Sequence, residues 1–279
     1  MTDNTLNTFT SIMKRNSVVK YIIILFQIFI TITTTGFEEE VIAQNDIIDY
    51  YRLLHRNEMT AMGSMVKGGS VSYWFQNDYF IPELMYNRIG MHFSRGENGA
   101  WFALSHDGWT HFGEMRFDAG YARRFGRRFS IALGGAYLMK HAEQYSPVHS
   151  FTIDFSSYCQ VTSSLGLGIR LFNPILMRYG VTGNEIIPLE FAFRMHYSRG
   201  DKILAHLVVE KRLPGGLDAA IGLLYRPIPT VVLSGECGLR KIGFGIHIPW
   251  KHFLFGVQTD WSYRISFSTA AMILYRFQL

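Results

Sequence analysis

The sequence predicts an all-β protein: a single transmembrane antiparallel up-and-down β-barrel of about 12–14 strands, preceded by a signal peptide. Three observations support this fold class. Apolar and polar residues alternate with a period of two in many successive segments, and turn-forming residues separate those segments roughly every 10–14 residues. The composition also fits, since 26 of the 279 residues are Gly, 15% are aromatic and only 18% are charged, against about 25% in a soluble domain.

The alternation is clearest in residues 187–197. Apolar residues on one face alternate with polar or small residues on the other: Leu189, Phe191, Phe193, Met195 and Tyr197 against Glu190, Ala192, Arg194 and His196. The pattern recurs at residues 113–123, 127–138, 148–156, 164–172, 217–226 and 242–247, and in the final segment 265–279. A soluble sandwich would bury the aromatic face, whereas a barrel in lipid turns it outward and lines the lumen with polar side chains. Recurrence over so many segments favours the barrel.

Composition excludes two other classes of protein. No segment after the N-terminal region has 18 consecutive apolar residues, and the mean hydropathy is only +0.07, which excludes a helical membrane bundle. The net charge is +5, but no Lys/Arg-rich run with interleaved aromatic residues is present. Nucleic acid is therefore not expected as a partner.

The chain divides into three predicted parts. Residues 1–43 are typical of a signal peptide, because Lys14 and Arg15 precede a short apolar run at 21–30. Cleavage is expected between Ala43 and Gln44, with Met13 as a plausible true start of the chain and an uncleaved N-terminal anchor as the alternative. Residues 44–62 are expected to form a periplasmic or plug segment. Residues 63–279 are expected to form a barrel in the cell outer membrane.

Charged residues and histidines on the predicted inner faces are the candidate site residues. They are Glu114, Arg116, Asp118, Asp154, Arg170, Glu190, Arg194, His196, His206, Glu210, Asp218 and Arg226. Two interpretations stay open: opposite charges pair and fill a closed lumen, or they line a polar path or ligand pocket. A path for hydrophobic molecules needs inward apolar residues, for which the candidates are Phe102, Leu104, Leu204, Val208 and Leu254.

Aromatic residues suggest contacts with the membrane and with the assembly apparatus. Trp and Tyr residues near predicted strand ends are expected to form interfacial girdles: Trp74, Trp101, Trp109, Trp250, Trp261, Tyr121, Tyr137, Tyr197, Tyr225 and Tyr275. The apolar face of the last strand ends in Tyr275, Phe277 and Leu279. Such an ending resembles the signal that the barrel assembly machinery reads, so that machinery and outer-membrane lipid are the expected partners.

No catalytic or cofactor-binding signature stands out. G-x-S-x-G, H-E-x-x-H and a glycine-rich phosphate loop with its Lys are absent, and no Cys/His spacing is typical of a metal site. The protein is therefore expected to be non-enzymatic and to hold no cofactor or metal. A lipid hydrolase with Ser and His on one inner face is the enzymatic alternative. The spacing of Cys159 and Cys237 does not indicate a disulfide.

Several short motifs resemble a family of Bacteroidetes outer-membrane barrels. Residues 165–174 (LGLGIRLFNP) look like its G-x-x-L-x-N-P strand end, and residues 222–227, 243–245 and 262–266 follow in a similar order. Residues 60–63 (TAMG) look like its A-x-G-G start, with Ser64 in place of the second Gly. On these motifs the chain resembles the fatty-acid-transporter-like superfamily, and within it the PorV/PorQ group. It departs from that pattern at residues 77–83 and 258–261, which makes it a divergent match.

The resemblance implies a non-enzymatic outer-membrane protein linked to type IX protein secretion or surface attachment, with secretion-system proteins as partners. The alternative function is an outer-membrane transporter for small hydrophobic molecules. An extended apolar lumen would favour the transporter. A closed lumen with large surface loops would favour the role in secretion.

Overall fold

The computed structural model describes residues 47–55, 58–180, 185–263 and 266–278. These residues belong to one compact unit, Glu40–Leu279. The predicted signal peptide and Leu279 of the predicted assembly signal lie outside the described residues. Neither α-helix in the described part of the chain is long and apolar enough to cross a bilayer.

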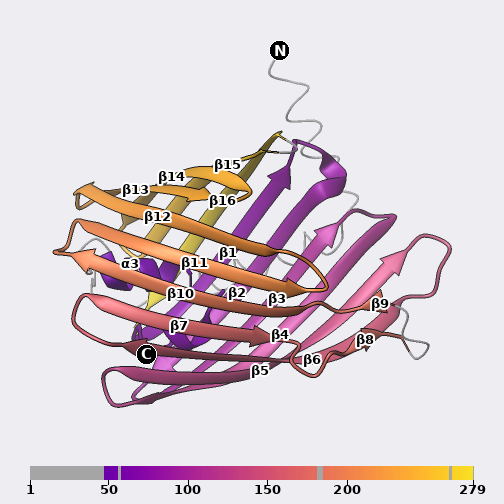
Figure 1. The fold of residues 1–279 in the computed structure, drawn as a ribbon, viewed down its shortest axis with the longest axis horizontal. Coiled ribbons are helices and arrows are strands. Elements are labelled where there is room, and N and C mark those ends of the chain that lie inside the picture. The colour runs from indigo at the N-terminus through magenta and orange to yellow at the C-terminus, as the bar shows by residue number, and fades with distance from the viewer. Residues whose placement is uncertain (1–46, 56–57, 181–184, 264–265, 279) are drawn as a thin grey trace. The chain divides into compact units, whose positions relative to one another are not determined.

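Fourteen antiparallel strands form a closed barrel, in which each strand pairs with its neighbours and β1 pairs with β16 (Figure 1). This confirms the predicted fold class, and the count lies at the upper end of the predicted number. The strands of the wall are β1 (Gly68–Asp78), β2 (Met85–Arg95), β3 (Asn98–Gly108), β4 (Phe112–Phe125), β5 (Phe129–Ala142), β6 (Val148–Gln160), β7 (Leu165–Phe172), β10 (Leu189–Arg199), β11 (Ile203–Leu213), β12 (Leu217–Ile228), β13 (Val231–Gly238), β14 (Lys241–Trp250), β15 (Phe253–Ser262) and β16 (Ser266–Phe277).

The two ends of the barrel differ in their connections. We call the end where β1 begins and β16 finishes the termini end. The six connections between strands at this end have two to four residues. At the opposite loop end, residues 173–188 form the longest connection, which contains the paired strands β8 (Arg178–Tyr179) and β9 (Glu185–Ile186). The short 3-10 helix η2 (Pro82–Leu84) follows β1 at the same end. Short turns on the side of the termini and longer loops opposite are the usual layout of outer-membrane barrels.

Side chains alternate between the outer and inner faces of the wall. On β12, Ile221 and Leu223 expose 65% and 47% of their surface on the outside, while Leu224 is only 1% exposed. On β10, Phe191 and Tyr197 are exposed, and Arg194 and His196 are buried on the inside. The large apolar residues of the outer faces therefore form a belt around an interior that contains polar, small and apolar side chains, because the strand period of two turns alternate residues to opposite faces.

Strand β3 is where the predicted faces are wrong. Phe102 is 44% exposed on the outer face, which Leu104 shares, whereas Trp101 and Ala103 are buried inside. Residues 100–104 are apolar on both faces, so the alternation does not show which face turns inward. Phe102 and Leu104 are therefore not lumen residues, and Trp101 does not belong to an interfacial girdle. Trp74 of β1 is not a girdle residue either, because it packs against the buried core cluster inside the barrel.

Two glycines make room for Trp101 inside the barrel. Gly120 on β4 pairs with Trp101 on one side and with Gly134 of β5 on the other. A Cβ atom on Gly120 would lie 2.3 Å from the indole ring and 2.6 Å from the Cα of Gly134. The large ring thus lies over two residues without side chains, which explains why small inner-face residues recur in these strands.

Replacing Gly120 with Ala is expected to destabilise the barrel by about 1–3 kcal/mol, because the added methyl group overlaps both a ring and a neighbouring backbone. Gly235→Ala is the matched control, since a Cβ there has nothing within 4 Å. The measurement is the unfolding midpoint of each variant, followed by the gel shift between folded and heated protein. Equal midpoints for the two variants would contradict the account of Trp101 packing.

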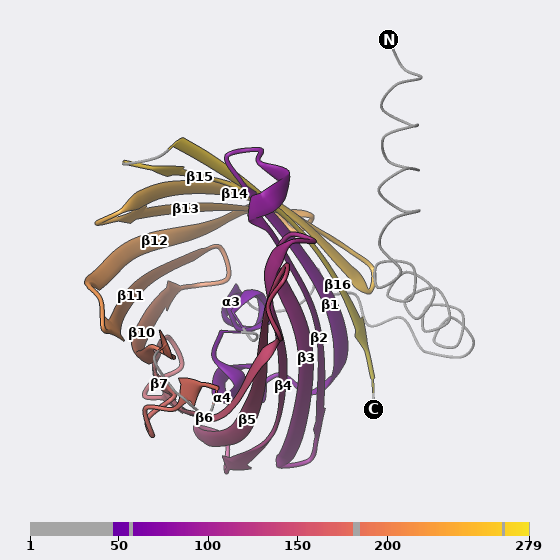
Figure 2. The ribbon, with the colours of Figure 1, turned by 90° about the vertical axis from the view of Figure 1, so that its right-hand side faces the viewer.

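Two short helices lie inside the ring of strands: α3 (Ile47–Leu54) and α4 (Thr60–Gly63) (Figure 2). We call the described residues 47–55 and 58–63 the plug. Ile47, Tyr51 and Leu53 are at most 1% exposed and belong to one core cluster with Leu204 and Leu224 of the wall. At roughly 25 cal/mol per Å² of buried apolar surface, this packing is the main force that holds the plug.

Serines of the wall fix the backbone of α4. Ser156 Oγ accepts a hydrogen bond from the Ala61 amide at 3.1 Å, and Ser130 Oγ donates one to the Ala61 carbonyl at 2.6 Å. Ser94 Oγ donates to the Ser64 carbonyl at 3.0 Å. These bonds satisfy backbone groups that a four-residue helix leaves unpaired. The small polar residues of the inner face are therefore the docking surface of the plug.

Candidate functional site

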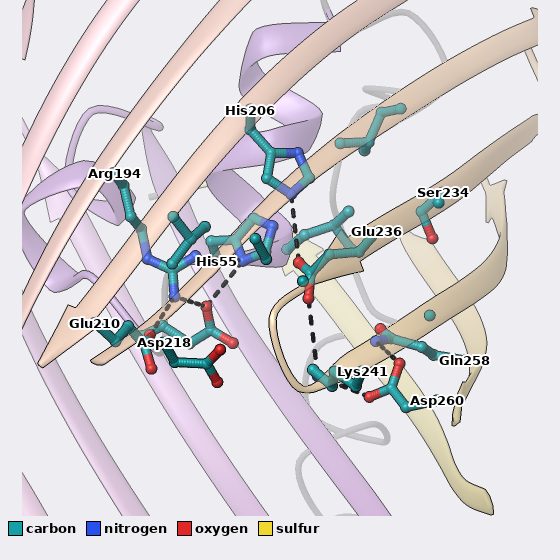
Figure 3. Close-up of a pocket in the computed structure, with 18 of the residues that line it drawn as sticks. His55, Arg194, His206, Glu210, Asp218, Ser234, Glu236, Lys241, Gln258 and Asp260 are labelled. Carbon is teal, nitrogen blue, oxygen red and sulfur yellow. Dashed lines mark hydrogen bonds and ion pairs between the residues drawn. The ribbon is translucent and has the colours of Figure 1, made fainter. Parts of the chain in front are cut away.

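A cavity of about 270 Å³ occupies the loop-end half of the lumen. Leu54, His55 and Glu58 of the plug line one side of it, and the rest of the lining comes from β1 and from strands β10 to β15 (Figure 3). We call it the loop-end cavity. It lies on the inner faces of strands whose outer faces are apolar, so it is held inside the wall of the barrel.

The lining of the loop-end cavity is rich in carboxylates. Five acidic residues line it, Glu58, Glu210, Asp218, Glu236 and Asp260, against two basic residues, Arg194 and Lys241. With histidines neutral, the lining therefore carries a net charge of three negative units, although the whole chain has a net charge of +5. Low-dielectric walls concentrate such a field, so the cavity attracts cations.

Each basic side chain is shared between two carboxylates. Arg194 Nη2 lies 2.6 Å from Glu58 Oε2 and 3.3 Å from Glu210 Oε1. Lys241 Nζ lies 2.8 Å from Asp260 Oδ2 and 3.9 Å from Glu236 Oε1. In both cases one carboxylate forms a short ion pair and the other a longer one. The cavity is therefore only partly neutralised by its own residues.

Glu58 joins the plug to the wall. Its carboxylate contacts Arg194 of β10, and His55 Nδ1 lies 2.9 Å from the same oxygen. The Glu58 side chain is half-exposed inside the lumen. Loss of water around it would raise the pKa of its carboxyl, but Arg194 and His55 outweigh this effect and hold that pKa well below its usual range. Glu58 is therefore ionised at neutral pH, and its ion pair with Arg194 connects the plug to the cavity lining.

Tyr51 lies among three histidine rings beneath the cavity. Its ring centroid is 4.5 Å from that of His55, 5.1 Å from His196 and 5.3 Å from His206. Burial raises the pKa of the Tyr51 phenol to about 12 against the opposing charge of Arg194. The phenol is therefore neutral, and the aromatic group packs the plug against β10 and β11.

The structure places the twelve candidate residues on the inner face but in separate groups. Four of them line the loop-end cavity: Arg194, His206, Glu210 and Asp218. Four others form ion pairs outside it: Arg116 with Asp118 at 2.7 Å, and Arg170 with Asp154 at 2.6 Å. Glu114 lies 3.6 Å from Lys140, and Glu190 lies 3.1 Å from Arg212. His196 Nε2 lies 2.8 Å from the Tyr158 hydroxyl, and Arg226 lies near the termini end of β12.

Four charged residues of the cavity were missed from sequence: Glu58, Glu236, Lys241 and Asp260. Glu58 lies in the plug, where no strand pattern applies. Glu236 and Lys241 flank a two-residue turn, and the glycines beside them blur the alternation. The spacing of Gln258 and Asp260 was an available signal, because residues two apart share a face of a strand.

A second cavity, of about 510 Å³, lies at the termini end. Arg52, Lys67, Arg95 and Arg276 line it, with Asp49 as the acidic residue. Its lining therefore has the opposite sign to that of the loop-end cavity. Arg52 belongs to the plug and donates a hydrogen bond to Gln160 Oε1 at 2.7 Å, so the plug separates a basic from an acidic compartment.

Known structures share this fold. No protein-family model and no curated protein sequence matches the chain. The P. putida toluene transporter TodX has a TM-score of 0.62 at 7% identity, over 79% of this chain and 93% of that one. The Ralstonia pickettii toluene transporter TbuX has a TM-score of 0.61 at 8% identity, over 80% and 93%. The CymD monoaromatic hydrocarbon channel has a TM-score of 0.58 at 9% identity, over 84% and 94%.

The outer surface of the barrel determines where the protein resides. Its exposed residues include Phe244 at 67%, Ile221 at 65% and Leu133 at 58%, all on strands of the wall. A closed barrel with an apolar outside and a polar inside is stable only in lipid, because its outer face would otherwise expose a large apolar area to water. The protein is an outer-membrane β-barrel.

Proposed function

We propose that this protein is a plugged outer-membrane channel that takes up a small polar solute through its loop-end cavity. The observation that carries the proposal is the position of that cavity directly against the plug, with Glu58 of the plug in its lining. A solute bound there contacts the residues that hold the plug. Pores with polar lining and a movable constriction select by charge and open by displacement of the constriction.

A hydrophobic cargo is less well supported by the lining. The similar structures are named as toluene transporters and as a monoaromatic hydrocarbon channel. Of the five apolar residues predicted to face inward, Phe102 and Leu104 face outward, and Leu204 and Leu254 are fully buried in the core cluster that contains the plug residues. Only the fifth, Val208, lines the loop-end cavity. An apolar solute in the loop-end cavity would strip water from charged groups without replacing their hydrogen bonds, which is costly.

An enzymatic role is also less well supported. Ser234 Oγ lies 3.1 Å from His247 Nε2, the pairing that a hydrolase nucleophile and base would show. The other ring nitrogen, Nδ1, has no hydrogen-bond partner among the described residues. A catalytic base of this kind is oriented by a third group on that nitrogen. The pair is better explained as part of the cavity lining.

The role in type IX secretion or surface attachment is the second candidate. Two observations favour it: the plug fills part of the lumen, and Ile175 and Leu176 on the longest loop are 54% and 55% exposed. Exposed apolar side chains on a surface loop are a common feature of protein contacts. Secretion-system proteins as partners remain a proposal on this basis.

Solute flux into liposomes tests the channel. Protein-containing liposomes are placed in arabinose, a small neutral solute that the bilayer itself excludes, and swelling is recorded for wild type and for the double variant Tyr51→Ala/Leu53→Ala. The variant is expected to swell about tenfold faster or more, because loss of two buried side chains costs the plug several kcal/mol of packing. Wild type is expected to swell slowly because the plug is in place.

The control is Glu114→Gln, an inner-face change outside the cavity, which is expected to behave as wild type. Swelling of all three samples at the rate of protein-free liposomes would overturn the channel proposal. That result would leave secretion or surface attachment as the better interpretation of a barrel with a fixed plug.

A further inference from the structure

We infer that the loop-end cavity binds a small organic amine, whose ammonium groups pair with carboxylates that the protein leaves incompletely neutralised. The inference rests on the proposed channel function and names the class of solute that the channel takes. It follows from three features of the lining: spare carboxylate charge, an unpaired imidazole nitrogen, and apolar surface between them.

Spare charge is concentrated on Asp218 and Glu236. The basic nitrogen beside Asp218 is Arg240 Nε, at 3.9 Å. Glu236 lies 3.9 Å from Lys241 Nζ and 3.5 Å from His206 Nε2. These distances exceed those of short charge-assisted hydrogen bonds, which are about 2.7–2.9 Å. Both carboxylates therefore have lone pairs to offer a bound cation.

His206 provides an independent observation. Its side chain is buried, lines the cavity, and points its Nε2 towards Glu236 (Figure 3). Neither of its two ring nitrogens has a hydrogen-bond partner among the described residues. A buried ring nitrogen without a partner is costly unless a ligand or water satisfies it. A neutral imidazole accepts a hydrogen bond at one nitrogen, so an ammonium donor suits it, while a carboxylate does not.

Apolar groups of the lining favour an alkylammonium over a bare ion. Leu54, Trp74, Val208 and Leu224 line the cavity between the charged residues. The methylene groups of an amine can pack against them, and an indole face also attracts an ammonium group. A volume of about 270 Å³ is large enough for several heavy atoms. Size, charge and apolar surface thus agree on one ligand class.

Calorimetric titration of the purified full-length protein tests the inference. Butane-1,4-diamine is compared with butane-1,4-diol and succinate, which have the same four-carbon skeleton but no charge or negative charge, and with Mg²⁺. Only the diamine is expected to bind. Asp218→Asn/Glu236→Gln is expected to weaken its binding about tenfold or more, and Glu114→Gln is expected to leave it unchanged. If the double variant no longer shows the gel mobility of the folded protein, the single variant Asp218→Asn, at the more exposed of the two positions, replaces it in the titration.

Four outcomes would overturn the inference. If the diol binds as tightly as the diamine, the cavity does not recognise the charge of its ligand. If Mg²⁺ binds as tightly as the diamine, the carboxylates attract any cation and do not select an amine. Unchanged diamine affinity in both carboxylate variants would show that Asp218 and Glu236 do not bind the ammonium groups. If the diamine does not bind but liposomes with the plug variant Tyr51→Ala/Leu53→Ala still swell fast, the amine ligand is refuted and the proposed channel stands. Absence of both refutes the channel as well.

Discussion

Glu58→Lys is expected to raise the mean ion conductance of the barrel about tenfold or more in planar bilayers. In the native protein the Glu58 carboxylate lies 2.6 Å from Arg194 Nη2. An ammonium group in its place would face Arg194, and the two like charges would repel each other where the native protein has an ion pair. Because α3 has only eight residues, it has little stability apart from its contacts with the wall. The plug should therefore leave its closed position for much of the time.

A charge swap distinguishes this mechanism from general damage to the lumen. Glu58→Lys combined with Arg194→Glu restores opposite charges at the contact and is expected to return most of the way to wild-type conductance. Glu114→Lys, which changes an inner-face carboxylate outside the loop-end cavity, should have little effect. Equal conductance of the single and double variants would mean that this ion pair does not hold the plug.

Ile221→Arg is expected to destabilise the folded barrel by about 2–4 kcal/mol, the usual cost of an arginine on the lipid face near the bilayer midplane. Ile221 lies near the middle of its strand, between Leu207 and Cys237 of the neighbouring strands, and is 65% exposed. A charged side chain there has to leave water for hydrocarbon. The measurement is denaturant-induced unfolding in lipid vesicles, followed by the gel shift.

Ile228→Arg is the matched control, because Ile228 is the last residue of the same strand and is 53% exposed. An arginine there reaches the headgroup region, so its cost is expected to be about 0–1 kcal/mol. Equal losses at the two positions would contradict the placement of the outer face of β12 in lipid. A larger loss at position 228 would place the bilayer elsewhere along the barrel.

The strands could be predicted because their signal is local. In residues 189–197, large apolar residues alternate with polar or small ones, and the inner and outer faces assigned to them agree with their exposure in the structure. Strand β3 shows the limit of this approach. Residues 100–104 are apolar at every position, so their pattern does not show which face of β3 turns into the lumen. That orientation depends on the glycines of β4 and β5 that accommodate Trp101. That information lies in other strands.

The loop-end cavity could be predicted only in part, because it is formed by register and by the plug. Arg194, Glu210 and Asp218 were identifiable as inner-face charges on their own strands. Their grouping with Glu58 and Glu236 depends on how distant segments are placed around the lumen. Segment 44–62 was expected to be a periplasmic or plug segment, but its sequence alone does not show which side chains of the wall it contacts.

The position of α3 also fixes an order of events during assembly. Its buried residues Ile47 and Tyr51 belong to one cluster with Leu204, Val232 and Leu274, which follow them by more than 150 positions in the chain. A helix of this length does not persist alone in water. The segment is therefore synthesised before every strand of the barrel, yet it cannot become ordered until the last strands are in place. Among the described residues, the part of the chain made first thus completes its contacts only with the part made last.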